Sequence, residues 1–177
     1  KNKYYFMTKT TQGFKYNNLC NLYKKKKNKI HDEATLFINN NLKIKLIKKI
    51  ILVVNNKKQI KKKFSKNVVI VKGGKERSDS SLIGLKCIKK FKPTNVLIHD
   101  AARPNFSLEL LKNLVKSLKK NKAVIPTVNT KDSIKYKVKK QLFNLNRDHS
   151  FSTQTPQAFR FNDLYNLSID QKAKIQD

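Results

Sequence analysis

The segment VVIVKGGKERSDSSLIGLKCIKKFKPTNVLIHDAARP, residues 68–104, decides the fold class of this 177-residue chain. It contains two short apolar runs, VVIV at 68–71 and VLI at 96–98, which are typical of strands buried on both faces of a parallel sheet. Between these runs, residues 80–91 carry apolar side chains at roughly helical spacing and stop before a proline. A strand, a helix and a second strand in this order predict a parallel sheet with helices on its faces.

The same pattern continues on both sides of this segment. IILVV at residues 50–54 predicts a further buried strand, and AVI at 123–125 predicts another. Ser107 is in position to cap a helix that has an apolar face. Residues 130–150 alternate weakly between apolar and polar side chains, which indicates a hairpin or arm. We therefore expect an α/β fold with a mostly parallel sheet flanked by helices, in one domain over residues 1–177.

The composition excludes several classes of protein. No stretch approaches 18 uninterrupted apolar residues, so we expect neither a transmembrane helix nor a membrane partner. Cys20 and Cys87 lie far apart and form no CxxC pair, which excludes a zinc knuckle and a disulfide scaffold. A reducing cytoplasm is the localisation that this cysteine usage favours.

The net charge of +30 suggests nucleic acid as a partner, but the kind of basic residue argues against it. Nearly all of the charge comes from lysine, whereas nucleic-acid readers favour the planar fork of arginine. The aromatic side chains are scattered along the sequence. We therefore favour compositional drift and expect no nucleic-acid partner, while a basic nucleic-acid-binding protein stays open as an alternative. The chain has only four arginines, so each is informative: Arg77, Arg103, Arg147 and Arg160.

The first candidate site is GGKERSDS, which follows a predicted strand and opens a predicted helix. Glycines at 73 and 74 allow a ligand to approach the backbone closely, and a helix N-terminus attracts anions. An ordinary strand-to-helix loop explains the same residues, so this motif alone does not decide between the two readings.

The second candidate site is HDAARP, at the end of the strand predicted over 96–98. Asp100 is well placed to hold Mg²⁺, and Arg103 could clamp a phosphate. The alternative is a surface turn with a local Asp–Arg pair. His99 is more simply explained as a structural residue.

Two further segments carry phosphate-binding side chains. Ser133 lies in DSIK, Arg147 in NRD, and Thr155 in TQTPQ. The hydroxyls and the guanidinium could grip a phosphate, but each segment alone is weak evidence.

In their order along the chain, GGKERSDSSLIGL, VLIHDAARP, AVIP…DSIK and NRDHSFSTQTPQAF resemble the 2-C-methyl-D-erythritol 4-phosphate cytidylyltransferase family over about residues 48–177. The resemblance implies a Rossmann-like nucleotidyltransferase fold, CTP as co-substrate and Mg²⁺ as cofactor. It also implies transfer of the cytidylyl group to 2-C-methyl-D-erythritol 4-phosphate in the non-mevalonate isoprenoid pathway. The family forms homodimers in which a β-arm reaches into the neighbouring subunit, and residues 127–150 resemble that arm.

Residue roles follow from the same resemblance. Asp100 is implied to bind both metal and nucleotide, and Asp100 and Arg147 are the implied catalytic residues, converging on one phosphorylated ligand. The implied nucleotide-binding residues are Gly73, Gly74, Ser80 and Asp100. The implied residues around the methylerythritol phosphate are Arg103, Ser133, Arg147 and Thr155, with Ser133 standing where the family usually has threonine.

The first 47 residues depart from the family pattern. The family opens with a glycine-rich AAGxGxR loop and a PKQ segment that wrap the triphosphate, and this chain has neither. Instead, residues 8–32 repeat residues 153–177 at a constant offset. The sequence DEA at residues 32–34 also stands far from its usual place in the family, which is near the C-terminal end. No NIK-type lysine motif is found.

Two expectations follow from this rearranged N-terminal segment. Residues 8–47 are expected to dock where the family's C-terminal segment would lie. Turnover is expected to fall by many orders of magnitude without the phosphate-wrapping loop, because several charge contacts are lost. The alternative to a slow enzyme is an inactive relative that binds a nucleotide or sugar phosphate.

Overall fold

A six-stranded mixed sheet forms the centre of the protein in the computed structural model, which describes residues 4–9, 47–56, 64, 66–100, 103 and 106–176. In spatial order the strands are β3 (Val68–Lys72), β2 (Ile47–Val54), β1 (Tyr4–Lys9), β4 (Asn95–Asp100), β10 (Gln157–Arg160) and β5 (Ala123–Val124). The first four are mutually parallel, whereas β10 runs antiparallel to both β4 and β5.

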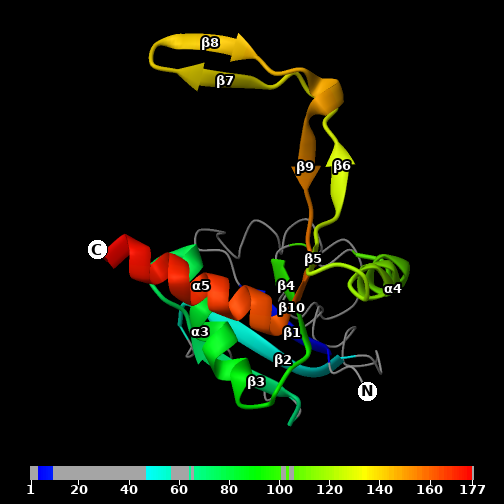
Figure 1. Ribbon diagram of the computed structural model, residues 1–177, viewed down its shortest axis with the longest axis vertical. Helices are drawn as coiled ribbons and strands as arrows, with labels where there is room; N and C mark the ends of the chain where they lie inside the picture. Colours follow the sequence, from blue (N-terminus) through cyan, green and yellow to red (C-terminus); the bar gives the residue numbers. More distant parts are fainter. Residues whose placement is uncertain are drawn as a thin grey trace, which may run out of the picture.

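Helices cover both faces of the sheet (Figure 1). α4 (Leu108–Ser117) packs on one face, and α3 (Arg77–Lys89) and α5 (Phe161–Gln176) pack on the other. Strand β2 supplies side chains to both layers by simple alternation. Ile50 and Leu52 face α4, whereas Ile51 and Val53 face α3, and none of these four side chains is more than 2% exposed.

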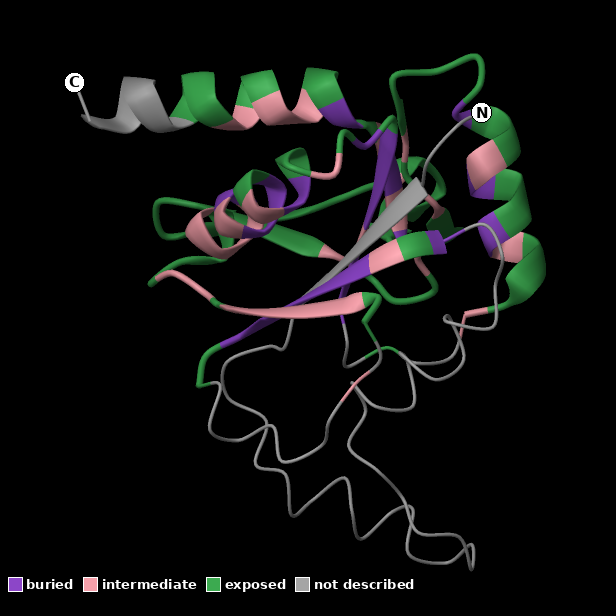
Figure 2. Cartoon of the chain, turned by 90° about the horizontal axis from the view of Figure 1, so that it is seen from below, coloured by how far each residue is buried: buried purple, intermediate pink, exposed green. Residues whose placement is uncertain are grey.

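The caps explain where the helices begin. The Ser107 hydroxyl accepts a hydrogen bond from the Leu110 amide at 3.0 Å, as the sequence predicts for a cap. α3 begins three residues before the expected start, because Glu76 and Asp79 form a capping box around its first turn. Buried residues line the helix surfaces that face the sheet (Figure 2).

An arm extends away from the sheet between β5 and β10 (Figure 1). Its first ribbon pairs β6 (Thr127–Asn129) with β9 (Phe151–Thr153), and its tip is a hairpin of β7 (Lys135–Val138) and β8 (Gln141–Asn144). A short 3-10 turn, η2 (Arg147–His149), joins the two ribbons. The predicted α/β class, the mostly parallel sheet and the protruding arm are confirmed.

Three features differ from the sequence-based expectations. β1 runs to Lys9 and lies in the middle of the sheet, so residues 8 and 9 continue a strand and are not part of a docked tail. Residue 47, at the other end of that segment, begins β2, and the remainder of the docking hypothesis concerns residues 10–46, which lie outside those that the structure describes. Neither the antiparallel β10 nor the helix α5 was expected.

In the described part of the chain, no helix is both long and apolar enough to cross a membrane.

Candidate active site at the carboxyl edge of the sheet

The loop after β3 is built around a close contact between its glycines and the start of α3. The Gly74 amide donates to the Ser80 hydroxyl at 3.1 Å. A Cβ added to Gly73 would lie 2.7 Å from the Ser80 Oγ, and one added to Gly74 would collide with the Asp79 side chain. The structure therefore gives both glycines a packing role, and it places their backbone beside the N-terminus of α3.

Asp100 ends β4 at the same edge of the sheet. Its side chain is 11% exposed, and one carboxylate oxygen accepts a hydrogen bond from Nη2 of Arg77 at 3.4 Å. The Asp100 amide donates to the Thr155 hydroxyl at 3.4 Å. The buried Thr155 is thus fixed to the main chain at Asp100, although 55 residues separate the two in the chain.

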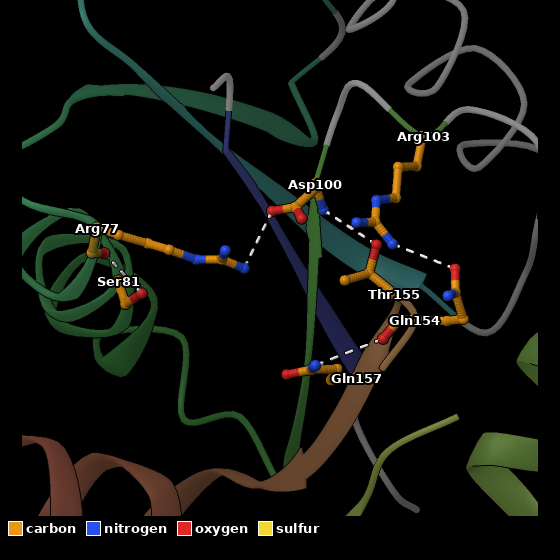
Figure 3. A network of polar contacts seen from close by, with 7 residues as sticks. All are labelled: Arg77, Ser81, Asp100, Arg103, Gln154, Thr155 and Gln157. Carbon is orange, nitrogen blue, oxygen red and sulfur yellow. Dashed lines mark hydrogen bonds and ion pairs between the residues drawn. The ribbon is translucent and has the colours of Figure 1, made fainter. Parts of the chain in front are cut away.

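Arg103 is held by the QTPQ segment (Figure 3). Its Nη1 donates to the side-chain oxygen of Gln154 at 3.2 Å, and its amide donates to the Asp100 carbonyl at 3.0 Å. The Gln157 amide group in turn donates to the Gln154 carbonyl at 3.4 Å. The HDAARP and QTPQ motifs therefore form one structural unit, which places three predicted site residues, Asp100, Arg103 and Thr155, side by side.

His99 has the structural role that the sequence indicates. The ring is fully buried and packs edge-on against Phe106 at 4.9 Å between ring centroids. Burial lowers the pKa of His99 to about 4, the largest effect among several, so the imidazole is neutral near pH 7. Its complete burial and its contact with Phe106 make His99 part of the core.

Ser133 and Arg147 lie on the arm and not at this edge. Arg147 opens η2, and Ser133 comes just before β7, where the Leu145 amide donates to the Ile134 carbonyl at 2.9 Å. Both residues are exposed. The η2 turn lies at the far end of the β6–β9 ribbon from the sheet (Figure 1), so one chain by itself does not bring Arg147 to Asp100.

Arg77 is the residue of this site that sequence reasoning missed. It is the first residue of α3, and its side chain, 70% exposed, reaches across the edge to Asp100. Because arginine is scarce in this chain, Arg77 could have been singled out from the sequence as a candidate site residue. The contact spans 23 residues and depends on β4 and β3 lying in one sheet, which local sequence does not reveal.

The residues present fit one kind of metal site. Within the described part of the chain, no group of three or more His, Cys, Asp or Glu side chains could hold an ion by itself. Mg²⁺ commonly binds through one or two carboxylates together with substrate phosphates and water. Asp100 therefore suits a magnesium ion that binds together with a phosphorylated ligand.

Comparisons with known proteins agree on one family. Residues 37–176 match the family described as "IspD: 2-C-methyl-D-erythritol 4-phosphate cytidylyltransferase". The chain is 46% identical over 131 residues to the bifunctional enzyme IspD/IspF of Pelagibacter ubique, covering 73% of this chain and 35% of the relative. It is 36% identical over 112 residues to the 2-C-methyl-D-erythritol 4-phosphate cytidylyltransferase of Bacillus licheniformis, covering 63% of this chain and 48% of that protein.

Solved structures show the same likeness in three dimensions. The 4-diphosphocytidyl-2C-methyl-D-erythritol synthase of Anaerococcus prevotii superposes with a TM-score of 0.75 at 29% identity, over 97% of this chain and 76% of that one. The expected nucleotidyltransferase fold is thereby confirmed. The chain spans between about a third and a half of the length of these two curated relatives.

Proposed function

Because the chain belongs to the 2-C-methyl-D-erythritol 4-phosphate cytidylyltransferase family, we propose that it transfers the cytidylyl group of CTP to 2-C-methyl-D-erythritol 4-phosphate. A phosphate oxygen of the acceptor attacks the α-phosphorus of CTP and forms a new P–O bond. The bond from the α-phosphorus to the α,β-bridging oxygen breaks, and pyrophosphate leaves with that electron pair. The product is 4-diphosphocytidyl-2-C-methyl-D-erythritol. Family membership favours this activity over the nucleic-acid-binding alternative.

The observation that carries the proposal is the linked unit of Asp100, Thr155 and Arg103. Thr155 is bonded to the main chain of Asp100, and Arg103 is bonded to the adjacent Gln154. Their hydroxyl and guanidinium therefore lie near the Asp100 carboxylate at the carboxyl ends of the parallel strands, where open α/β sheets bind their ligands. Phosphoryl-type transfer needs mainly positioning and charge neutralisation, and these groups supply both.

The roles divide between nucleotide and acceptor. The backbone of Gly73 and Gly74 and the hydroxyl of Ser80 lie at the N-terminus of α3 and would bind the cytidine. Asp100 would hold Mg²⁺, which when bound neutralises charge on the phosphate oxygens of the nucleotide. Arg103 and Thr155 would bind the phosphate of the acceptor.

A homodimer would complete the site with Ser133 and Arg147 from the partner subunit's arm. Support for an assembly comes from apolar side chains on the arm that are 40% exposed or more, and these are Val128, Tyr136, Val138, Leu142, Phe143, Leu145 and Phe151. Side chains of this kind on a protruding arm are suited to a protein surface.

Mixed subunits provide a direct test of this composite site. Asp100→Asn and Arg147→Met chains would each be inactive alone. After co-refolding, each mixed dimer would hold one intact site and one doubly altered site, so about a quarter of normal turnover returns when mixing is statistical. Absence of any recovery, with dimers verified by sedimentation, would contradict a site shared between subunits.

One observation favours the alternative of an inactive ligand-binding relative. The glycine-rich AAGxGxR loop that the family uses on the triphosphate is absent from the sequence, so any turnover is expected to be slow. Pyrophosphate release should be followed with CTP, Mg²⁺ and the acceptor, and calorimetry should follow CTP binding in parallel.

The outcomes separate the two readings. Release that requires both substrates supports the transferase, whereas CTP binding without release supports the inactive relative. Asp100→Asn should abolish the Mg²⁺ dependence of binding, and Asp170→Asn, an exposed carboxylate on α5, serves as its matched control. If neither CTP binding nor pyrophosphate release were detected, the transferase and a nucleotide-binding inactive relative would both be overturned.

A further inference from the structure

A polar cavity lies at the opposite end of β4 from Asp100. Its volume is about 570 Å³, within the usual range for small-molecule sites. Asn95, the first residue of β4, lines it, together with residues at the end of α4 and the start of α5. Since a strand rises about 3.3 Å per residue, roughly 16 Å separate this cavity from the carboxylate at the other end.

Asn95 is the buried polar residue of the cavity. Alternation along β4 puts it on the same face as Leu97, which packs against α4. The residue is only 5% exposed. Asn95 also lines the cavity, so its side-chain amide, which offers both donors and an acceptor, is available to a polar ligand there.

Two cationic side chains stand at the rim. Nη2 of Arg160 donates to the Lys119 carbonyl at 3.3 Å, and the Arg160 amide donates to the Lys122 carbonyl at 2.8 Å. These bonds fix the guanidinium against the main chain of Lys119, a residue that also lines the cavity. Arg160 thus has remaining donors that can bind an anion.

The start of α5 adds to the same field. The Phe161 amide donates to the Thr94 carbonyl at 3.0 Å, which fixes the helix N-terminus at the cavity. The positive end of a 16-residue helix attracts anions. Asp163 in its first turn opposes an anion nearby and instead offers an acceptor for a hydroxyl.

From this arrangement, we propose that the cavity binds a small phosphomonoester at a site separate from the carboxyl edge of the sheet. Arg160, Lys119 and the N-terminus of α5 hold the phosphate, and the Asn95 amide donates to it. Asp163 accepts a hydrogen bond from a hydroxyl on the ligand's carbon skeleton. The proposal does not depend on catalysis at Asp100.

Inorganic phosphate is the probe for the test, and its binding to the full chain is measured by ³¹P NMR titration at physiological salt. Arg160→Met and Asn95→Leu should each weaken binding at least tenfold. Asp163→Asn should tighten binding severalfold, because it removes the one negative side chain among the residues that line the cavity. Circular dichroism checks that each variant is folded.

A matched control separates a site from general attraction to a chain of net charge +30. Lys112→Met removes an exposed charge of α4 outside the cavity. It should leave phosphate binding at the cavity unchanged. Equal small effects of Arg160→Met, Lys112→Met and Asp163→Asn would overturn the proposal and leave only non-specific binding.

Discussion

The sheet and the arm are both built from paired strands, but their side chains have opposite surroundings. In β2, Ile50, Ile51 and Leu52 are fully buried between two layers of helices. In β7 and β8, all eight residues are exposed, and the stacked rings of Tyr136 and Phe143 are accessible to solvent. Hydrogen-bonded pairing therefore gives both regions a defined shape, while burial of apolar surface stabilises only the sheet within a single chain.

The largest expected difference comes from one substitution made in both regions. Leu85→Ala in α3 removes a fully buried side chain from the core, and it should lower the free energy of unfolding by about 2–5 kcal/mol. Leu142→Ala in the arm removes a side chain that is 65% exposed, and it should change that free energy by less than about 0.5 kcal/mol. Urea unfolding at low protein concentration measures both.

The comparison between the regions would break if the two variants lost equal stability at that concentration. A Leu142→Ala effect that grows as protein concentration rises would sharpen the comparison instead, because burial of the arm would then come from a second chain.

The next effect is a loss of folding stability at acid pH. The pKa of His99 is lowered by burial to about 4 in the folded protein, whereas the unfolded chain has the ordinary value of 6.5. The unfolded state therefore takes up the proton first as pH falls. The stability contribution is complete above pH 6.5 and is lost toward pH 4, by about 3 kcal/mol. Chemical unfolding at several pH values measures it.

His99→Gln should reduce this loss of stability between pH 6.5 and 4, whatever its effect at neutral pH. His149→Gln on the exposed arm serves as the control and should retain the full loss. An unchanged pH profile in the His99 variant would show that the sheet's core does not contain this acid-sensitive group.

A smaller effect is expected at the edge of the sheet. Gly74→Ala places a Cβ against the Asp79 side chain, which caps α3 by accepting from the Glu76 amide at 3.3 Å. Displacing that cap should cost about 1–3 kcal/mol in unfolding free energy. Thermal unfolding compares it with Lys75→Ala, an exposed neighbour that should be nearly neutral. Equal melting temperatures for the two variants would mean that this loop can shift without strain.

The smallest effect is a gain in the arm. Lys139 follows β7 with a φ of 53°, in the left-handed region that favours glycine. Lys139→Gly should stabilise the hairpin by about 0.5–1 kcal/mol, seen as slower amide hydrogen exchange in β7 and β8 with no change in the sheet. Lys140→Gly, at a position outside that region, should give no such gain. Faster exchange in the Lys139 variant would contradict the prediction.

Sequence reasoning succeeded where burial and chain position coincide. The apolar runs at 50–54, 68–71 and 96–98 correspond to buried or half-buried strands, since central strands of a parallel sheet have no polar face. It also placed Asp100 at a strand end, beside Arg103. It could not place β1 in the centre of the sheet, because the alternation and length of a strand do not reveal its neighbours.

The candidate site was predicted in part for the same reason. Thr155 joins Asp100 because β10 returns antiparallel beside β4, an arrangement that only the assembled sheet determines. Arg77 and Arg160, the two arginines to which no role was assigned, contact residues 23 and 41 positions away. The sequence-based prediction that Asp100 and Arg147 meet is not met within one chain and now rests on the proposed dimer.

The sequence by itself determined the α/β class, the segments of β2, β3, β4, α3 and α4, and the motifs that indicate a phosphorylated ligand. These follow from local periodicity and from residue types, which report burial and chemistry without reference to partners. Only the tertiary structure decided the order of the strands, the pairing of Arg77 with Asp100, and the projection of the arm away from the sheet. Each of these depends on contacts between distant segments, whose free energy arises only when the whole sheet is assembled.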